Sequence, residues 1–208
     1  MRKTGNTTAY RENLRRKILE TAMPLFKKKG IKAVRMDDIA TEMAISKRTL
    51  YELYSNKEDL LYECIKNEEK RMMRKIAEYA ENAENEMEVI AYFIKMKLKD
   101  FGSINPLFFY EINKYKRIVE LLRNYKEQQR ANSNIFMKRC TEQGFFRSDL
   151  NFEIVEKLSD AAINFVMQTQ LYEKYMPNEI LHTFILVYLR GCCTNKGLEY
   201  IDKLLFEN

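Results

Sequence analysis

Four side chains that could bind nucleic acid lie within five residues of one another. Lys47 and Arg48 are cationic, Thr49 and Tyr51 carry hydroxyl groups, and all four follow Ser46, a residue suited to the N-cap of a helix. Cations and hydroxyl donors at the leading end of a helix fit the phosphates and base edges of the DNA major groove. The segment therefore indicates a DNA-recognition helix.

Residues 35–60 contain the elements that would position this helix. Apolar residues recur at helical spacing in two short runs, which are Met36, Ile39, Ala40 and Met43, then Leu50, Leu53 and Tyr54. Ala44 and Ile45 lie between the runs and would form a tight turn. The pattern predicts a helix-turn-helix, followed at once by a further helix that Ser55 or Asn56 would cap.

The same residues resemble the DNA-binding domain of TetR-type (tetracycline-repressor-like) transcriptional regulators. The pattern extends back over residues 18–30 and includes Asp38-Ile39-Ala40, Ile45-Ser46-Lys47, Thr49-Leu50-Tyr51, Tyr54 and Lys57-Glu58-Asp59-Leu60. The resemblance implies phosphate contacts from Tyr51 and Lys57. Two residues depart from it. Ala44 occupies a turn position where the family usually has Gly, at a cost of about 1–2 kcal/mol if the residue is left-handed. Pro24 lies inside the first helical pattern and is predicted to kink it.

The distribution of charge supports a nucleic-acid partner. Residues 1–60 hold 14 Lys and Arg against 8 Asp and Glu, and the remaining residues hold 22 of each kind. All of the net charge of +6 therefore coincides with the helix-turn-helix, as expected if that end of the chain approaches phosphates.

Lys57 is singled out by its position at the start of a helix, where a cation opposes the helix dipole. A phosphate bound there would explain it. Tyr54 either contacts the DNA backbone or is a core aromatic. The complete set of predicted DNA contacts is Arg35, Lys47, Arg48, Thr49, Tyr51, Tyr54 and Lys57.

The whole chain is predicted to be all-α, with about nine helices and no internal repeat. Residues 1–9 form a loose basic arm in this prediction. The expected helices are 10–29, the two of the motif, 57 to about 82, 87–101, a short helix from Pro106, 115–143, 152 to about 172, and 177 to about 193. A last helical piece follows Gly197 over residues 198–206. We expect a DNA-binding domain over residues 1–60 and a helical effector-binding and dimerisation domain over residues 61–208.

The helices expected at 152–172 and 177–193 carry apolar residues on every face. A helix of this kind must be covered all round, and one modest domain would struggle to do so. We therefore expect both helices to pair with their copies in a second chain, giving a homodimer that matches a palindromic site. The alternative is a single thick core.

Aromatic and Met residues of the second half are candidates for a cavity. TetR-type proteins generally bind a small effector in this half, so the resemblance implies a pocket, although such stripes are more often plain core. The predicted pocket residues are Phe93, Met96, Phe101, Phe109, Phe136, Phe165 and Gln168.

Other classes of function have weaker support. The four Cys residues form no C-x-x-C motif, and His182 is the only histidine, so no metal site, cofactor or disulfide framework is predicted. An enzyme using Cys64, Cys192 or Cys193 with His182 lacks an orienting motif. The chain shows no signal peptide and no apolar run long enough to cross a bilayer, so we expect a cytoplasmic protein.

The sequence thus predicts a dimeric, sequence-specific transcriptional regulator without catalytic activity, most consistent with a repressor that a small-molecule effector releases from a palindromic operator. The alternative is an effector-independent DNA-binding regulator that acts through a protein partner.

Overall fold

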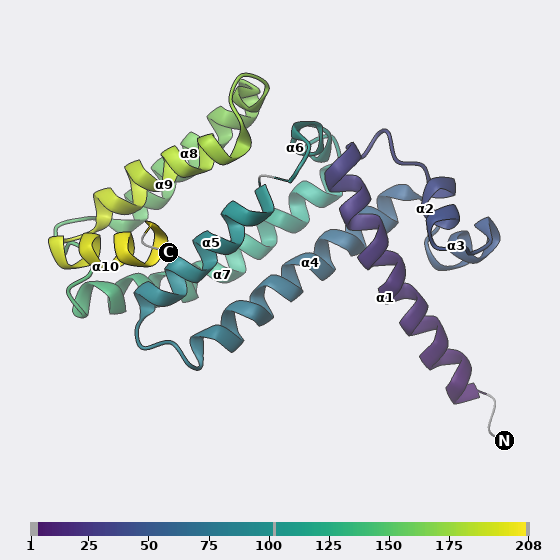
Figure 1. The fold of residues 1–208 in the computed structure, drawn as a ribbon, viewed down its shortest axis with the longest axis horizontal. Helices are drawn as coiled ribbons and strands as arrows, with labels where there is room; N and C mark the ends of the chain where they lie inside the picture. The colour runs from purple at the N-terminus through teal and green to yellow at the C-terminus, as the bar shows by residue number, and fades with distance from the viewer. Residues whose placement is uncertain (1–3, 102, 207–208) are drawn as a thin grey trace. The chain divides into compact units, whose positions relative to one another are not determined.

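The computed structural model describes residues 4–101 and 103–206, and these residues are predominantly helical (Figure 1). The helices are α1 (Thr4–Lys29), α2 (Met36–Glu42), α3 (Lys47–Leu53), α4 (Lys57–Ala80), α5 (Glu86–Phe101), α6 (Pro106–Ile112), α7 (Lys116–Glu142), α8 (Phe152–Gln168), the 3₁₀ helix η1 (Leu171–Glu173), α9 (Pro177–Cys192) and α10 (Asn195–Phe206). Within the described residues there is no strand, only an isolated bridge between Phe146 and Cys193. The predicted all-α class is confirmed.

The chain forms two compact units. The first contains residues Met1–Met72 and Leu107–Leu121, and the second contains Met73–Pro106 and Leu122–Asn208. The division into domains that the sequence suggests, residues 1–60 and 61–208, stays a prediction.

The core of the first unit is formed by one face of each helix. On α1, the buried residues Leu14, Ile18, Ala22 and Phe26 recur every four residues, as expected for a helix with one covered face. Buried residues of the next three helices include Ile39, Ala40, Leu50, Leu53, Leu60 and Leu61. This core fixes which faces of α2 and α3 remain exposed.

An ion pair between α1 and α4 adds to this packing. Lys27 Nζ lies 2.7 Å from Glu68 Oε1, and both side chains are only 21% exposed. Burial opposes ionisation of Glu68, but the hydrogen bonds and charges of Lys27 and Arg71 hold its pKa below the usual value.

Of the predictions for the two ends of α1, one is confirmed and one is wrong. Gly30 has a φ of +84° and donates to Phe26 O at 2.9 Å, so the predicted glycine stop is confirmed. The loose arm is wrong for residues 4–9, which belong to α1, and residues 1–3 lie outside the described ranges. The helix also runs through Pro24, which is exposed.

The second unit is organised around α5, against which α9 and α10 both pack. Its core contains the buried residues Met87, Ala91, Cys140, Phe145, Phe146, Cys192, Cys193 and Ile201. The helix α10 begins at Asn195 rather than at the predicted Leu198, because Gly197 does not break it. A Cβ atom at Gly197 would lie 2.2 Å from the Phe145 carbonyl oxygen, so this glycine permits close packing inside a helix.

The helix α8 differs from the others because none of its residues is buried. It ends at Gln168, before the predicted 172, and Gln170 follows in the left-handed region with a φ of 53°. Ile154, Leu158 and Phe165 are 55, 56 and 58% exposed. None of the described helices combines the length and apolar character needed to cross a membrane.

Candidate nucleic-acid interface

The turn between α2 and α3 contains a strained residue. Ala44 has a φ of 51°, so the left-handed conformation that the sequence left conditional is present. The backbone N–H groups of Ala44 and Ile45 donate to Thr41 O and Ala40 O, both at 3.0 Å. These bonds hold the turn closed despite the cost of about 1–2 kcal/mol for an L residue in this conformation.

Ser46 caps α3 as the sequence predicts. Its Oγ accepts the Thr49 backbone N–H at 3.0 Å, and the Ser46 and Thr49 hydroxyl oxygens are 2.8 Å apart. The cap satisfies one free donor at the start of the helix. It also fixes where Lys47 and Arg48 leave the backbone.

The polar side of α3 faces solvent. Leu50 and Leu53 are buried, whereas the side chains of Lys47 and Arg48 are 66 and 89% exposed. Tyr51 is 48% exposed. Residues predicted to reach the groove therefore lie on the accessible side of the helix.

Both α3 cations have carboxylate partners. Lys47 Nζ lies 2.5 Å from Asp37 Oδ2, and Arg48 Nε lies 2.9 Å from Glu52 Oε1. Exposed pairs of this kind contribute at most about 1 kcal/mol, so either cation can exchange its carboxylate for a phosphate at small cost. Arg35, also exposed, precedes α2, and its backbone N–H donates to Asp38 Oδ2 at 2.8 Å.

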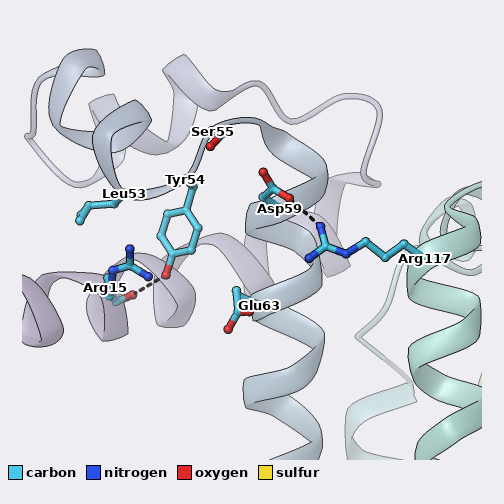
Figure 2. A pocket seen from close by; sticks show the side chains of 7 residues that line it. All are labelled: Arg15, Leu53, Tyr54, Ser55, Asp59, Glu63 and Arg117. Carbon is cyan, nitrogen blue, oxygen red and sulfur yellow. Dashed lines mark hydrogen bonds and ion pairs between the residues drawn. The ribbon is translucent and has the colours of Figure 1, made fainter.

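Tyr54 is a core residue, one of the two alternatives that the sequence left open. It is 4% exposed, its hydroxyl donates to Arg15 O at 3.4 Å, and the Arg15 guanidinium lies 5.5 Å from the ring centroid (Figure 2). Burial raises the pKa of Tyr54 to about 12. A contact between Tyr54 and the DNA backbone stays a prediction.

Lys57 has a structural role that the sequence argument missed. Its Nζ donates to Ile31 O at 2.8 Å, to Val34 O at 3.0 Å and to Lys32 O at 3.3 Å. These carbonyls give the cation a structural explanation beside the predicted phosphate, and the phosphate contact stays a prediction. The α4 cap is Asn56, whose Oδ1 accepts the Asp59 N–H at 2.9 Å.

Two residues of the first unit, one from α6 and one from α7, contact α4 and the segment between α1 and α2. Arg117 binds Asp59 at 2.6 Å beside a polar surface hollow (Figure 2). Its guanidinium also lies 4.0 Å from the Tyr62 ring centroid. Glu111 Oε2 accepts the Lys32 N–H at 2.7 Å. Sequence reasoning did not find these contacts, because no local pattern relates residues so far apart.

The predicted pocket residues lie in different environments. Phe109 belongs to the first unit, and the side chain of Phe101 is outside the described ranges. In the second unit, Phe136 packs against the core, Met96 is half-buried, and Phe93, Phe165 and Gln168 are exposed. The effector pocket stays a prediction.

The four cysteines are buried and free. Burial raises the pKa of each thiol, to about 12 for Cys140 and Cys193, which opposes formation of the nucleophilic thiolate. His182 is ten residues before Cys192 on the same helix, a rise of about 15 Å. Within the described part of the chain, no cluster of three His, Cys, Asp or Glu residues could hold a metal ion.

Comparison with known proteins finds a family model that matches part of the first unit. Residues 18–64 match the model of "Bacterial regulatory proteins, tetR family". No match is found among curated proteins.

Several solved structures share the fold. A TetR-family transcriptional regulator from Agrobacterium tumefaciens has a TM-score of 0.69 at 15% identity, covering 88% of this chain and 100% of that one. A candidate transcriptional regulator from Saccharomonospora viridis, in complex with choline, has a TM-score of 0.65 at 22% identity and coverages of 85% and 97%. The regulator FadR from Bacillus subtilis, in complex with stearoyl-CoA, has a TM-score of 0.57 at 16% identity and coverages of 84% and 97%.

Proposed function

We propose, from the match of residues 18–64 to the model of the tetR family, that the chain is a member of this family and a homodimeric, sequence-specific DNA-binding transcriptional regulator. The observation that carries the proposal is the exposed cationic side of α3, held by the Ser46 cap on a domain that contains all of the excess positive charge. A short helix presented in this way fits the major groove.

The proposed contacts divide into two classes. Lys47, Arg48, Thr49 and Tyr51 face the base edges, where donors and hydroxyls discriminate between base pairs. Phosphate contacts, which set register and give salt dependence, come from the remaining predicted residues. They are Arg35 and Tyr54, with Tyr51 contributing to both classes, and Lys57 is the remaining candidate, whose ammonium also binds three backbone carbonyls.

The proposed dimer forms through α8 and α9. Ile154, Leu158, Ala161 and Phe165 are all exposed and recur at steps of four, three and four residues, which places them on one face of α8. Val187 of α9 is 63% exposed. A contiguous apolar face of this kind is suited to a two-fold interface with a second copy, and such a dimer matches a palindromic operator.

We further propose that a small-molecule effector binds in the helical second half, near the predicted pocket residues of the second unit, Phe93, Met96, Phe136, Phe165 and Gln168, and releases the DNA. Of the structures with this fold, one contains choline and another contains stearoyl-CoA. These complexes support the proposal that this chain also binds a small molecule. The effector must bind the DNA-free conformation more tightly, because only that preference can shift the equilibrium. A regulator acting through a protein partner is the second candidate, and a small molecule that raises the melting temperature and releases DNA excludes it.

Selection of bound fragments from random duplex DNA tests the proposal. We expect the purified protein to enrich a palindrome with two half-sites about one helical turn apart. Enrichment of no duplex at low ionic strength refutes DNA binding, and enrichment of a single asymmetric site refutes the dimer.

A further inference from the structure

The segment between α1 and α2, residues 30–35, is held by one side chain from α4. Lys57 Nζ lies within 2.8–3.3 Å of the carbonyl oxygens of Ile31, Lys32 and Val34. A lysine ammonium has three donors and no acceptor. Each donor therefore has one carbonyl partner, and none is left for a phosphate oxygen.

The surroundings of this ammonium are those of a structural group. Ile31 and Val34 are fully buried, and Lys57 itself is half-buried. Desolvation lowers the pKa of Lys57, while the charges of Glu111 and Asp38 oppose that shift. Glu111 also accepts the Lys32 N–H at 2.7 Å, so two oppositely charged side chains bind the same short segment.

The segment leads directly into the DNA-binding helices. Arg35 is the N-cap of α2, which begins at Met36, and the tight Ala44 turn connects α2 to α3. Whatever fixes residues 31–34 therefore also fixes the start of α2, and through the turn it sets the position of α3.

We propose that Lys57 is a positioning residue, which places the recognition helix by binding three backbone carbonyls, and that it does not neutralise a DNA phosphate. The inference rests on the proposed DNA-binding function and assigns Lys57 a different part in it. Lys47 is the useful contrast, because its side chain is 66% exposed and pairs with an exposed carboxylate.

The two roles predict different responses to salt. The logarithm of the binding constant falls with the logarithm of salt concentration in proportion to the number of phosphates neutralised, by about 0.9 per contact. Removing a phosphate contact therefore reduces the slope. Removing a positioning contact weakens binding at every salt concentration and leaves the slope unchanged.

The experiment compares Lys57→Met with Lys47→Met, two variants that each lose one ammonium. Stoichiometric titration first gives the fraction of active protein. The dissociation constant of that fraction is then measured on a selected duplex over a series of salt concentrations. We expect Lys57→Met to bind roughly tenfold more weakly, the effect of losing a charge-assisted hydrogen bond, with the slope of the unsubstituted protein. Lys47→Met, which removes a proposed base-edge donor, should instead lower the preference for the selected duplex over random duplex.

A charge-preserving variant, Lys57→Arg, gives an independent test and decides the matter if Lys57→Met does not fold. A planar guanidinium fits three convergent carbonyls poorly but binds phosphate well. Weaker binding by Lys57→Arg at unchanged slope supports positioning, and equal or tighter binding overturns it.

Two further outcomes also overturn the proposal. One is a Lys57→Met slope reduced by about 0.9, which indicates a phosphate contact. The other is a smaller active fraction with an unchanged dissociation constant, which indicates stability alone. Failure of the proposed function is distinguishable, because the unsubstituted protein would then bind no duplex. In that case, amide hydrogen exchange at residues 32–36 still tests the contacts between Lys57 and the carbonyls. Faster exchange in Lys57→Met supports these contacts, and unchanged exchange refutes them.

Discussion

Truncation of Ile154 to Ala should weaken the dimer if the exposed face of α8 is the interface. Ile154 is 55% exposed in the single chain. Fully burying an Ile side chain contributes about 1.5–3 kcal/mol, so covering this fraction contributes about 0.8–1.7 kcal/mol per copy. A two-fold interface contains the residue twice, and the substitution should cost about 2 kcal/mol in all, or about thirtyfold in the dimer dissociation constant.

Sedimentation equilibrium over a series of protein concentrations measures this constant. The chain offers a matched control in Ile135 of α7, which is also 55% exposed. We expect Ile135→Ala to leave the dissociation constant unchanged. Equal effects of the two substitutions, or no effect of Ile154→Ala, would refute the assignment of the interface to α8.

Three other predictions concern the first unit. Ala44→Gly should raise the free energy of unfolding by about 0.5–1 kcal/mol in urea denaturation, because relief of left-handed strain exceeds the entropy cost of glycine; a loss of stability would contradict it. Asp37→Asn should raise affinity for random duplex DNA by up to about fivefold in fluorescence anisotropy, since the carboxylate that pairs with Lys47 is removed, and unchanged affinity would contradict this. The lowered pKa of Glu68 contributes stability that is present above the unfolded value near 4.5 and is lost as pH falls through the folded value, so Glu68→Gln should show a smaller drop in urea midpoint between pH 5 and pH 3. An equal drop in both proteins would remove Glu68 from this account.

The parts of the fold that the sequence predicts are those governed by local chemistry. Ser46 caps α3, Gly30 and Gly144 follow helices with positive φ, and Pro106 is the first residue of α6. Each of these features depends on the residue itself and on neighbours within one turn. Such features can be recognised without knowledge of the tertiary structure.

The errors arise where distant packing overrides a local rule. Gly197 predicts a helix boundary, yet it lies inside α10 because the Phe145 carbonyl leaves no room for a Cβ. Lys57 is unfavourable at a helix start by the dipole rule, yet carbonyls 23 to 26 residues earlier in the chain bind it.

The candidate site shows the same division. The exposed cations of α3 follow from the helical period, because Leu50 and Leu53 define the buried side. The bond from Lys32 to Glu111, 79 residues away, has no signal in the sequence. The proposed effector pocket would need side chains from several helices at once, so the sequence pattern alone does not define it.

The binding of duplex DNA by a pair of chains is the property on which the proposed function most directly depends. The mass of the complex between purified protein and a selected duplex, measured at low and then rising ionic strength, tests this in one titration. We predict two chains on each palindromic duplex, with a binding constant that falls steeply as salt increases. A protein that retains no duplex at low ionic strength, or that binds as a single chain at every concentration, would contradict it.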